Sequence, residues 1–137
     1  KLIGDKSLSK RDFSRIKKPL EKFGASFFPP KKTTLPLFIK GNSDLKGIEY
    51  NEKKGSAQIK SCVMMAALNA TGETIIKAKK SRNHTELMFK NLKIPIKIKK
   101  TKNFDFIKIK KIDKIKSINY NIPSDIRTSA FFIVLTK

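Results

Sequence analysis

Apolar residues recur along the chain at two spacings, and each spacing predicts a different kind of element. Ile16, Leu20 and Phe23 lie three or four residues apart, as on one buried face of a helix, and Gly24 follows as a stop. Runs such as "IPIKIKK", in which apolar and polar residues alternate, predict half-buried strands. Helices are therefore expected at 13–23, 56–70, 83–92 and from Ser124 onward. Strands are expected at 25–28, 35–40, 46–50, 73–78, 94–99, 104–109 and 118–121.

The order of these elements repeats. The stretch "GIEYNEKKGSAQIKSCVMMAAL" (47–68) aligns with "SINYNIPSDIRTSAFFIVL" (117–135), and each has a Tyr-Asn strand before a helix that begins at Ser. Upstream, "SKRDFSRIKKPLEKFG" (9–24) aligns with "KSRNHTELMFKNLK" (80–93). A fixed period, here about 70 residues, indicates a duplicated structural unit. The predicted class is therefore α+β, with repeated βαβαββ-like units that pack helices on a small sheet.

The charge of the chain bears on its partners. The net charge is +21, but only four of the 32 basic residues are Arg, whereas base readout by proteins relies on Arg. Most Lys residues alternate with Ile, which predicts Lys on the solvent face of strands. Solvated strand faces are therefore favoured over a nucleic-acid groove, and nucleic acid is not the expected partner. Attraction of small anionic substrates is compatible with either interpretation.

Further features bear on the cellular setting. No apolar run approaches the 18 or so residues of a membrane span, so no membrane partner is expected, and no signal-peptide pattern opens the chain. The abrupt start at "KLIGDKS", without Met, predicts a fragment of a longer protein. The single Cys62 excludes an internal disulfide and fits a reducing cytoplasm. Its place in "KSCVMMAAL" predicts a small core residue.

One candidate site lies in "GSAQIKSC" (55–62), at the start of the most apolar helix. Ser56 is the expected N-cap, and the free backbone N–H groups at a helix N-terminus can bind an anion. Gln58 and Lys60 would add donors, and Gly55 would allow a ligand to approach the backbone. From these residues alone, a capped helix and an anion site remain equally open.

A second candidate site is "KSRNHTE" (80–86). Ser81 or Asn83 could cap the next helix, with Glu86 at capping-box spacing from Asn83, and Arg82 offers a planar fork suited to phosphate. Arg11 in "LSKRDFSR" occupies the matching place before the first helix.

Other kinds of site have little support in the sequence. His84 is the only His, which leaves little material for a metal site or a catalytic triad. The sequence has no phosphate-binding loop of the P-loop type and no acidic cluster suited to a metal.

These segments together resemble the 5-enolpyruvylshikimate-3-phosphate synthase family (3-phosphoshikimate 1-carboxyvinyltransferases). The resemblance runs through "GDKSLSKR", "PLEKFGASF", "LPLFIKG", "LKGIEY", "GSAQIKSCVMMAAL", "SRNHTE" and "SDIRTSAFF", in the order of the family. It implies a fold of two lobes, each an inverted α/β prism of three βαβαββ units. Residues 1–122 would form the latter part of one lobe, about one and a half to two units. Residues 123–137 would form the opening helix of the other lobe.

The resemblance also implies an activity and a set of binding residues. The family transfers the carboxyvinyl group of phosphoenolpyruvate to shikimate 3-phosphate, releases phosphate, and needs no metal or organic cofactor. Arg11 and Gln58 would bind phosphoenolpyruvate. The residues implied for shikimate 3-phosphate are Ser56, Ala57, Gln58, Ser81 and Arg82.

Some features depart from the family pattern. Asp12 stands where Pro is usual, Asn83 where Asp is common, and Arg127 where Ser is usual. No catalytic residue of the family is matched in this chain, so it is expected to be inactive without the missing lobe of the same protein. Two alternatives remain: a fragment of the UDP-N-acetylglucosamine enolpyruvyl transferase type, and a Lys-rich nucleic-acid-binding module, whose binding would weaken steeply with salt.

Overall fold

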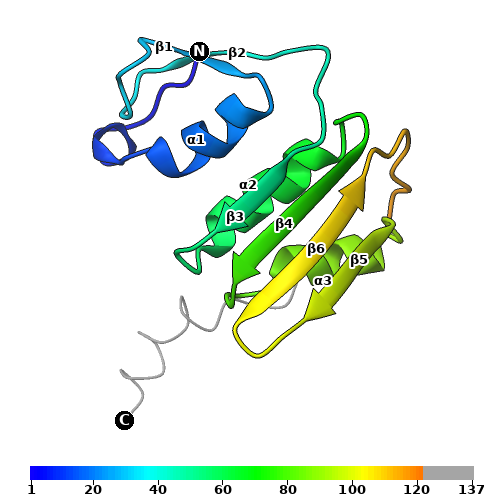
Figure 1. Ribbon diagram of the computed structural model, residues 1–137. Coiled ribbons are helices and arrows are strands. Elements are labelled where there is room, and N and C mark those ends of the chain that lie inside the picture. Colours follow the sequence, from blue (N-terminus) through cyan, green and yellow to red (C-terminus); the bar gives the residue numbers. More distant parts are fainter. Residues whose placement is uncertain (122–137) are drawn as a thin grey trace, which may run out of the picture.

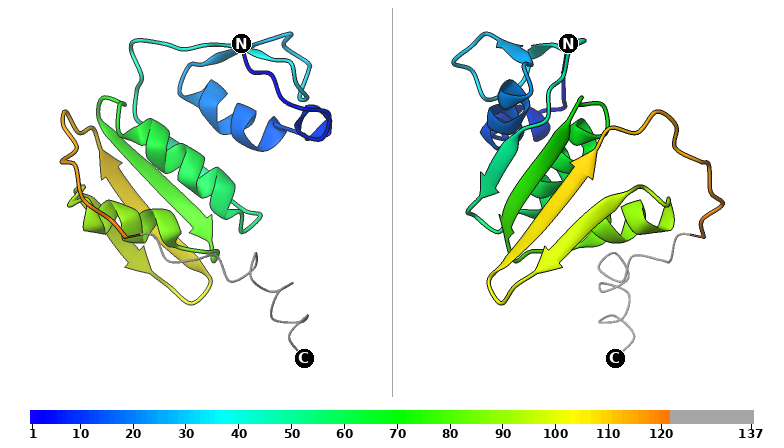
Figure 2. Two further views of the ribbon diagram at one scale, coloured as in Figure 1. Left: turned by 180° about the vertical axis from the view of Figure 1, so that it is seen from behind. Right: turned by 45° about the vertical axis from the view of Figure 1, so that its right-hand side comes forward.

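A four-stranded sheet with helices on one face forms the middle of the chain in the computed structural model, which describes residues 1–121 (Figure 1). Its strands are β3 (Glu49–Glu52), β4 (Glu73–Lys79), β6 (Phe104–Lys110) and β5 (Ile96–Lys100), in that spatial order. Helices α2 (Ala57–Ala67) and α3 (His84–Asn91) lie against one face of the sheet, and the opposite face is open in the described part (Figure 2). This arrangement confirms the predicted α+β class.

The N-terminal part of the chain forms a smaller layer beside α2. It contains a 3₁₀ turn, η1 (Leu8–Lys10), the helix α1 (Ser14–Lys22), and a two-stranded antiparallel sheet of β1 (Ser26–Phe28) and β2 (Phe38–Lys40). Helix α1 packs against α2, as Figure 1 shows. Pro19 lies inside α1, within the helix expected at 13–23, although proline in a helix interior costs about 3 kcal/mol relative to alanine.

Strand pairing recurs along the chain. Helix α1 is followed by the antiparallel pair β1–β2, and α3 is followed by the antiparallel pair β5–β6. Leu2 forms an antiparallel bridge with Leu37, just before β2, and β4 likewise pairs antiparallel with β6. This recurrence supports the duplicated unit, whose boundaries stay a prediction. Strands β3 and β4 pair in parallel, so α2 is the crossover between them.

The register of the sheet confirms the predicted faces of the Lys–Ile strands. Ile76, Ile107 and Ile98 lie in one row across β4, β6 and β5 on the helix-covered side. The next row, Lys77, Phe106 and Lys99, lies on the open side. Because neighbouring side chains of a strand point to opposite faces, the Ile residues face the helices and most Lys residues face solvent.

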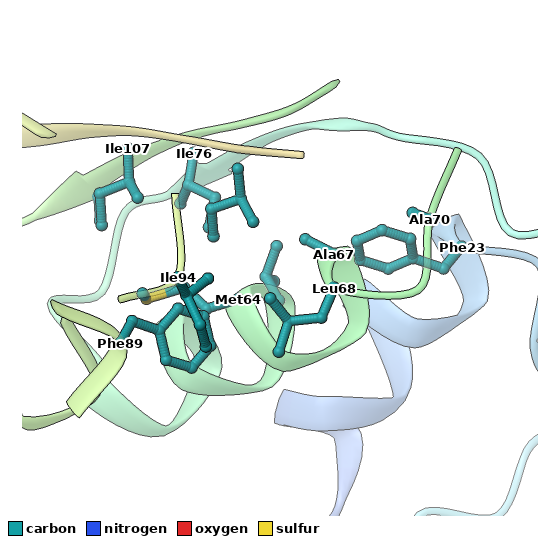
Figure 3. Packing of buried hydrophobic residues seen from close by; sticks show 12 residues of the cluster. Phe23, Met64, Ala67, Leu68, Ala70, Ile76, Phe89, Ile94 and Ile107 are labelled. Atoms are coloured by element: carbon teal, nitrogen blue, oxygen red, sulfur yellow. The ribbon is translucent and has the colours of Figure 1, made fainter. Parts of the chain in front are cut away.

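The hydrophobic core fills the space between α2, α3 and the covered face of the sheet (Figure 3). Met64 and Ala67 of α2 pack with Phe89 of α3 against Ile76 and Ile107 of the sheet. Phe23, just after α1, reaches the same cluster and joins the N-terminal layer to it. Fully burying a large apolar side chain contributes about 1.5–3 kcal/mol, so this cluster fixes how α2 and α3 lie on the sheet.

One expected element is absent from the described residues. The strand predicted at 118–121 is irregular, because a strand needs a hydrogen-bonded neighbour and no described strand pairs with this segment. The helix expected from Ser124, and Arg127 with it, lie outside the described residues.

Candidate anion-binding site

The N-terminus of α2 and the segment that enters α3 line one depression of about 600 Å³. It contains every residue predicted for shikimate 3-phosphate, together with two further cations. The lining residues are Arg15, Lys54, Gly55, Ser56, Ala57, Gln58, Ser81 and Arg82. Three of them are cationic and none is acidic, so the depression favours an anion.

Local hydrogen bonds shape the α2 side of the site. Ser56 is the N-cap, as predicted, and its Oγ accepts a hydrogen bond from the backbone N–H of Ile59 at 3.4 Å. The N–H groups of the first turn, which include those of Ala57 and Gln58, have no acceptor within the helix. They add the positive end of the helix dipole to the depression.

A buried carboxylate fixes the loop that leads into α2. Glu52 is 2% exposed, and its two oxygens accept hydrogen bonds from the backbone N–H groups of Lys54 and Gly55, both at 2.8 Å. Gly55 has a φ of +70°, and a Cβ there would lie 3.1 Å from the carbonyl oxygen of Lys80. The loop therefore presses against the end of β4, which brings Ser81 beside Ser56.

The α3 side of the site differs from the capping box that the spacing predicts. Asn83 is the N-cap but makes no side-chain capping hydrogen bond, and Glu86 turns inward to meet Lys60 of α2 at 2.6 Å. The predictions of Glu86 as a capping residue and of Lys60 as a ligand donor are therefore wrong, since both side chains are buried against each other. Arg82 is exposed, and the buried hydroxyl of Ser81 has no hydrogen-bond partner among the described residues.

The two arginines of the first segment have different positions. Arg11 is exposed at the end of η1, where its backbone N–H donates to Leu8, and it is not among the lining residues. Arg15, in the first turn of α1, lines the depression instead. Sequence reasoning missed Arg15. The signal that could have identified Arg15 was its place four residues after Arg11, near the start of the predicted helix.

Asp12 takes a structural role beside these arginines. Its carboxylate accepts hydrogen bonds from the Ser14 backbone N–H at 2.9 Å and from the Ser14 hydroxyl at 2.5 Å. The hydroxyl bond, followed by the backbone bond, lowers the pKa of Asp12. Asp12 thus accepts hydrogen bonds from Ser14 at the start of α1, whose N-cap is Phe13, and no ion pair links Asp12 to Arg11 in the described residues.

A second depression of about 440 Å³ adjoins the first, and Ala57, Gln58 and Arg82 line both. Cys62 lies in this second depression and is half-buried, so the prediction of a core cysteine is wrong. His84 and Thr85 of α3 line the same depression. Burial raises the pKa of the thiol.

Other kinds of site are not found in the part of the chain that the structure describes. Residues 1–121 hold no group of three or more His, Cys, Asp or Glu side chains that could bind a metal ion. Within the same residues, no helix has the length and apolar character needed to cross a bilayer. The geometry supports recognition of a phosphate-bearing ligand.

Comparisons with known proteins place this chain in a family. The model of the family described as EPSP synthase (3-phosphoshikimate 1-carboxyvinyltransferase) matches residues 1–136. The 3-phosphoshikimate 1-carboxyvinyltransferase of Caldicellulosiruptor bescii is 45% identical over 136 residues, which cover 98% of this chain and 31% of the relative. The enzyme of the same name from Thermotoga sp. (strain RQ2) is 42% identical over 135 residues, with the same two shares.

A solved structure shows the same likeness in three dimensions. EPSP synthase from Acinetobacter baumannii superposes with a TM-score of 0.77 at 40% identity, covering 96% of this chain and 30% of that one. The chain thus spans about a third of the length of the curated relatives it matches. By its sequence and its fold, this chain belongs to the EPSP synthase family.

Proposed function

We propose that the chain forms one wall of the substrate site of a 3-phosphoshikimate 1-carboxyvinyltransferase. The reaction would transfer the carboxyvinyl group of phosphoenolpyruvate to shikimate 3-phosphate and release phosphate, a step of aromatic amino acid biosynthesis. One observation carries the proposal: the N-terminus of α2, the segment that enters α3 and three cations line one depression that contains no acidic side chain. The names of the relatives support the choice of substrates.

The positions of the side chains suggest how the substrates are divided. The phosphate of shikimate 3-phosphate would lie between the hydroxyl of Ser81, the guanidinium of Arg82 and the N–H groups at the start of α2. Gln58 lines both depressions, which fits a side chain that contacts both substrates. Arg15 and Lys54 would add positive charge at the rim. The contact of Arg11 with phosphoenolpyruvate remains part of the proposal.

The proposal assigns turnover to a larger assembly. The matched relatives are about three times as long as this chain. The opposite wall of the site would come from segments outside it. Stabilising the charge of a transition state requires donors on both sides of the reacting carbon in a dry cleft. The partner of this chain would therefore be the other lobe of the same protein. The reaction would run in the cytoplasm without metal or organic cofactor, and Cys62 would stay reduced there.

Calorimetric titration of the 137-residue chain with shikimate 3-phosphate tests the proposal. Arg82→Ala should weaken binding about 10–100-fold, because loss of a hydrogen bond to a charged group costs about 1.5–3 kcal/mol. Lys97→Ala removes the same charge from the open face of the sheet and should leave binding within about twofold. Equal affinities of Arg82→Ala and the unsubstituted chain would contradict the site.

Assays of turnover and of nucleic-acid binding complete the test. Phosphate release from shikimate 3-phosphate and phosphoenolpyruvate should stay at background for this chain. Sustained release that depends on both substrates would refute the need for a second lobe. Tight, salt-sensitive binding of single-stranded nucleic acid, with no affinity for shikimate 3-phosphate, would favour the Lys-rich binding module instead.

A further inference from the structure

The first turns of α2 and α3 are joined by two polar contacts beneath the anion-binding depression. Lys60 Nζ of α2 lies 2.6 Å from Glu86 Oε1 of α3. On the adjacent residues, the hydroxyls of Ser61 and Thr85 form a hydrogen bond of 2.6 Å. We call these two contacts, formed by four residues, the interhelical polar contacts.

The ion pair lies fully inside the protein. The side chains of Lys60 and Glu86 are 1% and 6% exposed, whereas the other ion pairs of the described residues each have at least one partner more than 40% exposed. Lys60 Nζ meets Glu86 Oε1 as an ion pair but makes no hydrogen bond in the described part of the chain, and neither does the second carboxylate oxygen of Glu86, Oε2. The pair is therefore incompletely satisfied, although it lies next to a well-packed apolar core.

Such a pair needs a reason beyond stability. Taking two charges out of water is costly, and replacing a buried ion pair by apolar residues of similar size is often neutral or stabilising. Beside these polar contacts, Met64 of α2 and Phe89 of α3 belong to one apolar core cluster. Two Met or Leu side chains at 60 and 86 would extend that cluster. An ion pair instead has a preferred separation, which apolar contacts lack.

The place of the contacts indicates what they control. Gln58 precedes Lys60 by two residues on α2, and Arg82 precedes Glu86 by four residues on the segment that enters α3. Gln58 and Arg82 both line the depression, and Ser61 and Thr85 line the adjoining one with them. Because a helix is stiff over one turn, the distance between Lys60 and Glu86 sets the distance between the two helix ends.

We propose that Lys60 and Glu86 are positioning residues, which hold the ends of α2 and α3 at the separation needed to bind one phosphate between Gln58 and Arg82. The inference rests on the proposed function for the identity of the ligand. The geometric part of the inference, the separation of the two helix ends, is independent of the proposed function. Neither side chain touches the ligand, and Ser61 and Thr85 support the same spacing.

A double variant separates positioning from stability. Lys60→Met with Glu86→Leu keeps the buried volume and leaves no unpaired charge, so the midpoint of thermal unfolding should stay within about 5 °C of that of the unsubstituted chain. Affinity for shikimate 3-phosphate should nevertheless fall about tenfold. The matched control is Lys108→Met with Glu73→Leu, which removes the ion pair of 3.3 Å on the open face of the sheet, the face without helices. This control should bind like the unsubstituted chain.

A second measurement makes the inference testable without any ligand. Residual dipolar couplings of backbone amides report the relative orientation of α2 and α3. The double variant should change this orientation, while couplings within the sheet stay the same. If the unsubstituted chain does not bind shikimate 3-phosphate, the proposed function fails and the couplings alone decide the inference. Unchanged couplings, or full affinity in the double variant, would overturn it.

A milder variant covers the case in which the double variant does not fold. Ser61→Ala with Thr85→Val removes the neutral hydrogen bond and leaves the ion pair in place. Its affinity should fall about threefold, with a smaller change in helix orientation of the same kind. Full affinity and an unchanged orientation in this variant would equally overturn the inference.

Discussion

Replacing Glu52 by Gln should destabilise the protein by about 1–3 kcal/mol, although the two side chains have nearly the same shape. The carboxylate of Glu52 accepts one backbone hydrogen bond at each oxygen, from Lys54 and Gly55. A Gln amide keeps one acceptor and turns an NH₂ group toward the other N–H donor. One buried N–H then has no acceptor, which costs about 1–3 kcal/mol. Removing a buried charge recovers part of the desolvation cost, so the loss should lie within this range and not above it.

Urea unfolding followed by circular dichroism measures this loss as a difference in the free energy of unfolding. Glu49→Gln is the matched control, because Glu49 is an exposed residue of the same strand and its replacement should change stability by less than about 0.5 kcal/mol. Binding of shikimate 3-phosphate should weaken in Glu52→Gln, since the loop that carries Gly55 and Ser56 loses its anchor. Equal stabilities of the two variants would refute the idea that the carboxylate holds this loop.

The other predictions concern the loop, the core and the thiol. Gly55→Ala should lower the free energy of unfolding by about 1–3 kcal/mol. The φ of +70° disfavours a residue with a Cβ, and the added Cβ would lie 3.1 Å from the carbonyl oxygen of Lys80. Urea unfolding checks this, and no change would show that the turn relaxes. Phe89→Ala should cost about 3–5 kcal/mol, whereas Leu87→Ala, at a residue 53% exposed on the same helix, should cost less than about 1 kcal/mol. Similar costs at the two positions would contradict the packing of α3. Burial raises the pKa of Cys62, so less thiolate is present at neutral pH. Alkylation by iodoacetamide at pH 7 should therefore be slower than for a free thiol, and it should speed up as the pH rises. Alkylation at pH 7 as fast as that of glutathione would disprove this.

Local patterns were sufficient for most of the fold. Alternating Lys and Ile placed β5 and β6 with their Ile side chains inward, because a strand buried on one face requires that alternation. The Ser56 cap and the helix it begins were likewise predictable, since capping depends on neighbours in sequence. The prediction of a strand at 118–121 was wrong, because a strand also needs a neighbouring strand to pair with and the local pattern of residues does not reveal one.

The site was predictable in part for the same reason. The Ser and Gln residues of the site could be predicted because they lie at or near helix ends, and patterns in the sequence locate helix ends. Arg15 enters the depression only because α1 packs on α2, and that contact is tertiary. Lys60 and Glu86 were misassigned because each has a plausible local role, as a ligand donor and as a capping residue. Their actual partner lies on another helix, which no spacing in the sequence indicates.

The parallel pairing of β3 with β4 bears on the order in which the protein folds. The β5–β6 hairpin joins residues close in sequence. Strand β3 can pair with β4 only after the connecting chain, which includes α2, has crossed over one face of the sheet. Contacts between distant residues form more slowly, because the loop must close before the contact stabilises it. We therefore expect the hairpin to become protected from hydrogen exchange first and the Glu52–Gln58 segment later. The ligand-binding end of α2 would thus be among the last parts of the chain to mature during folding.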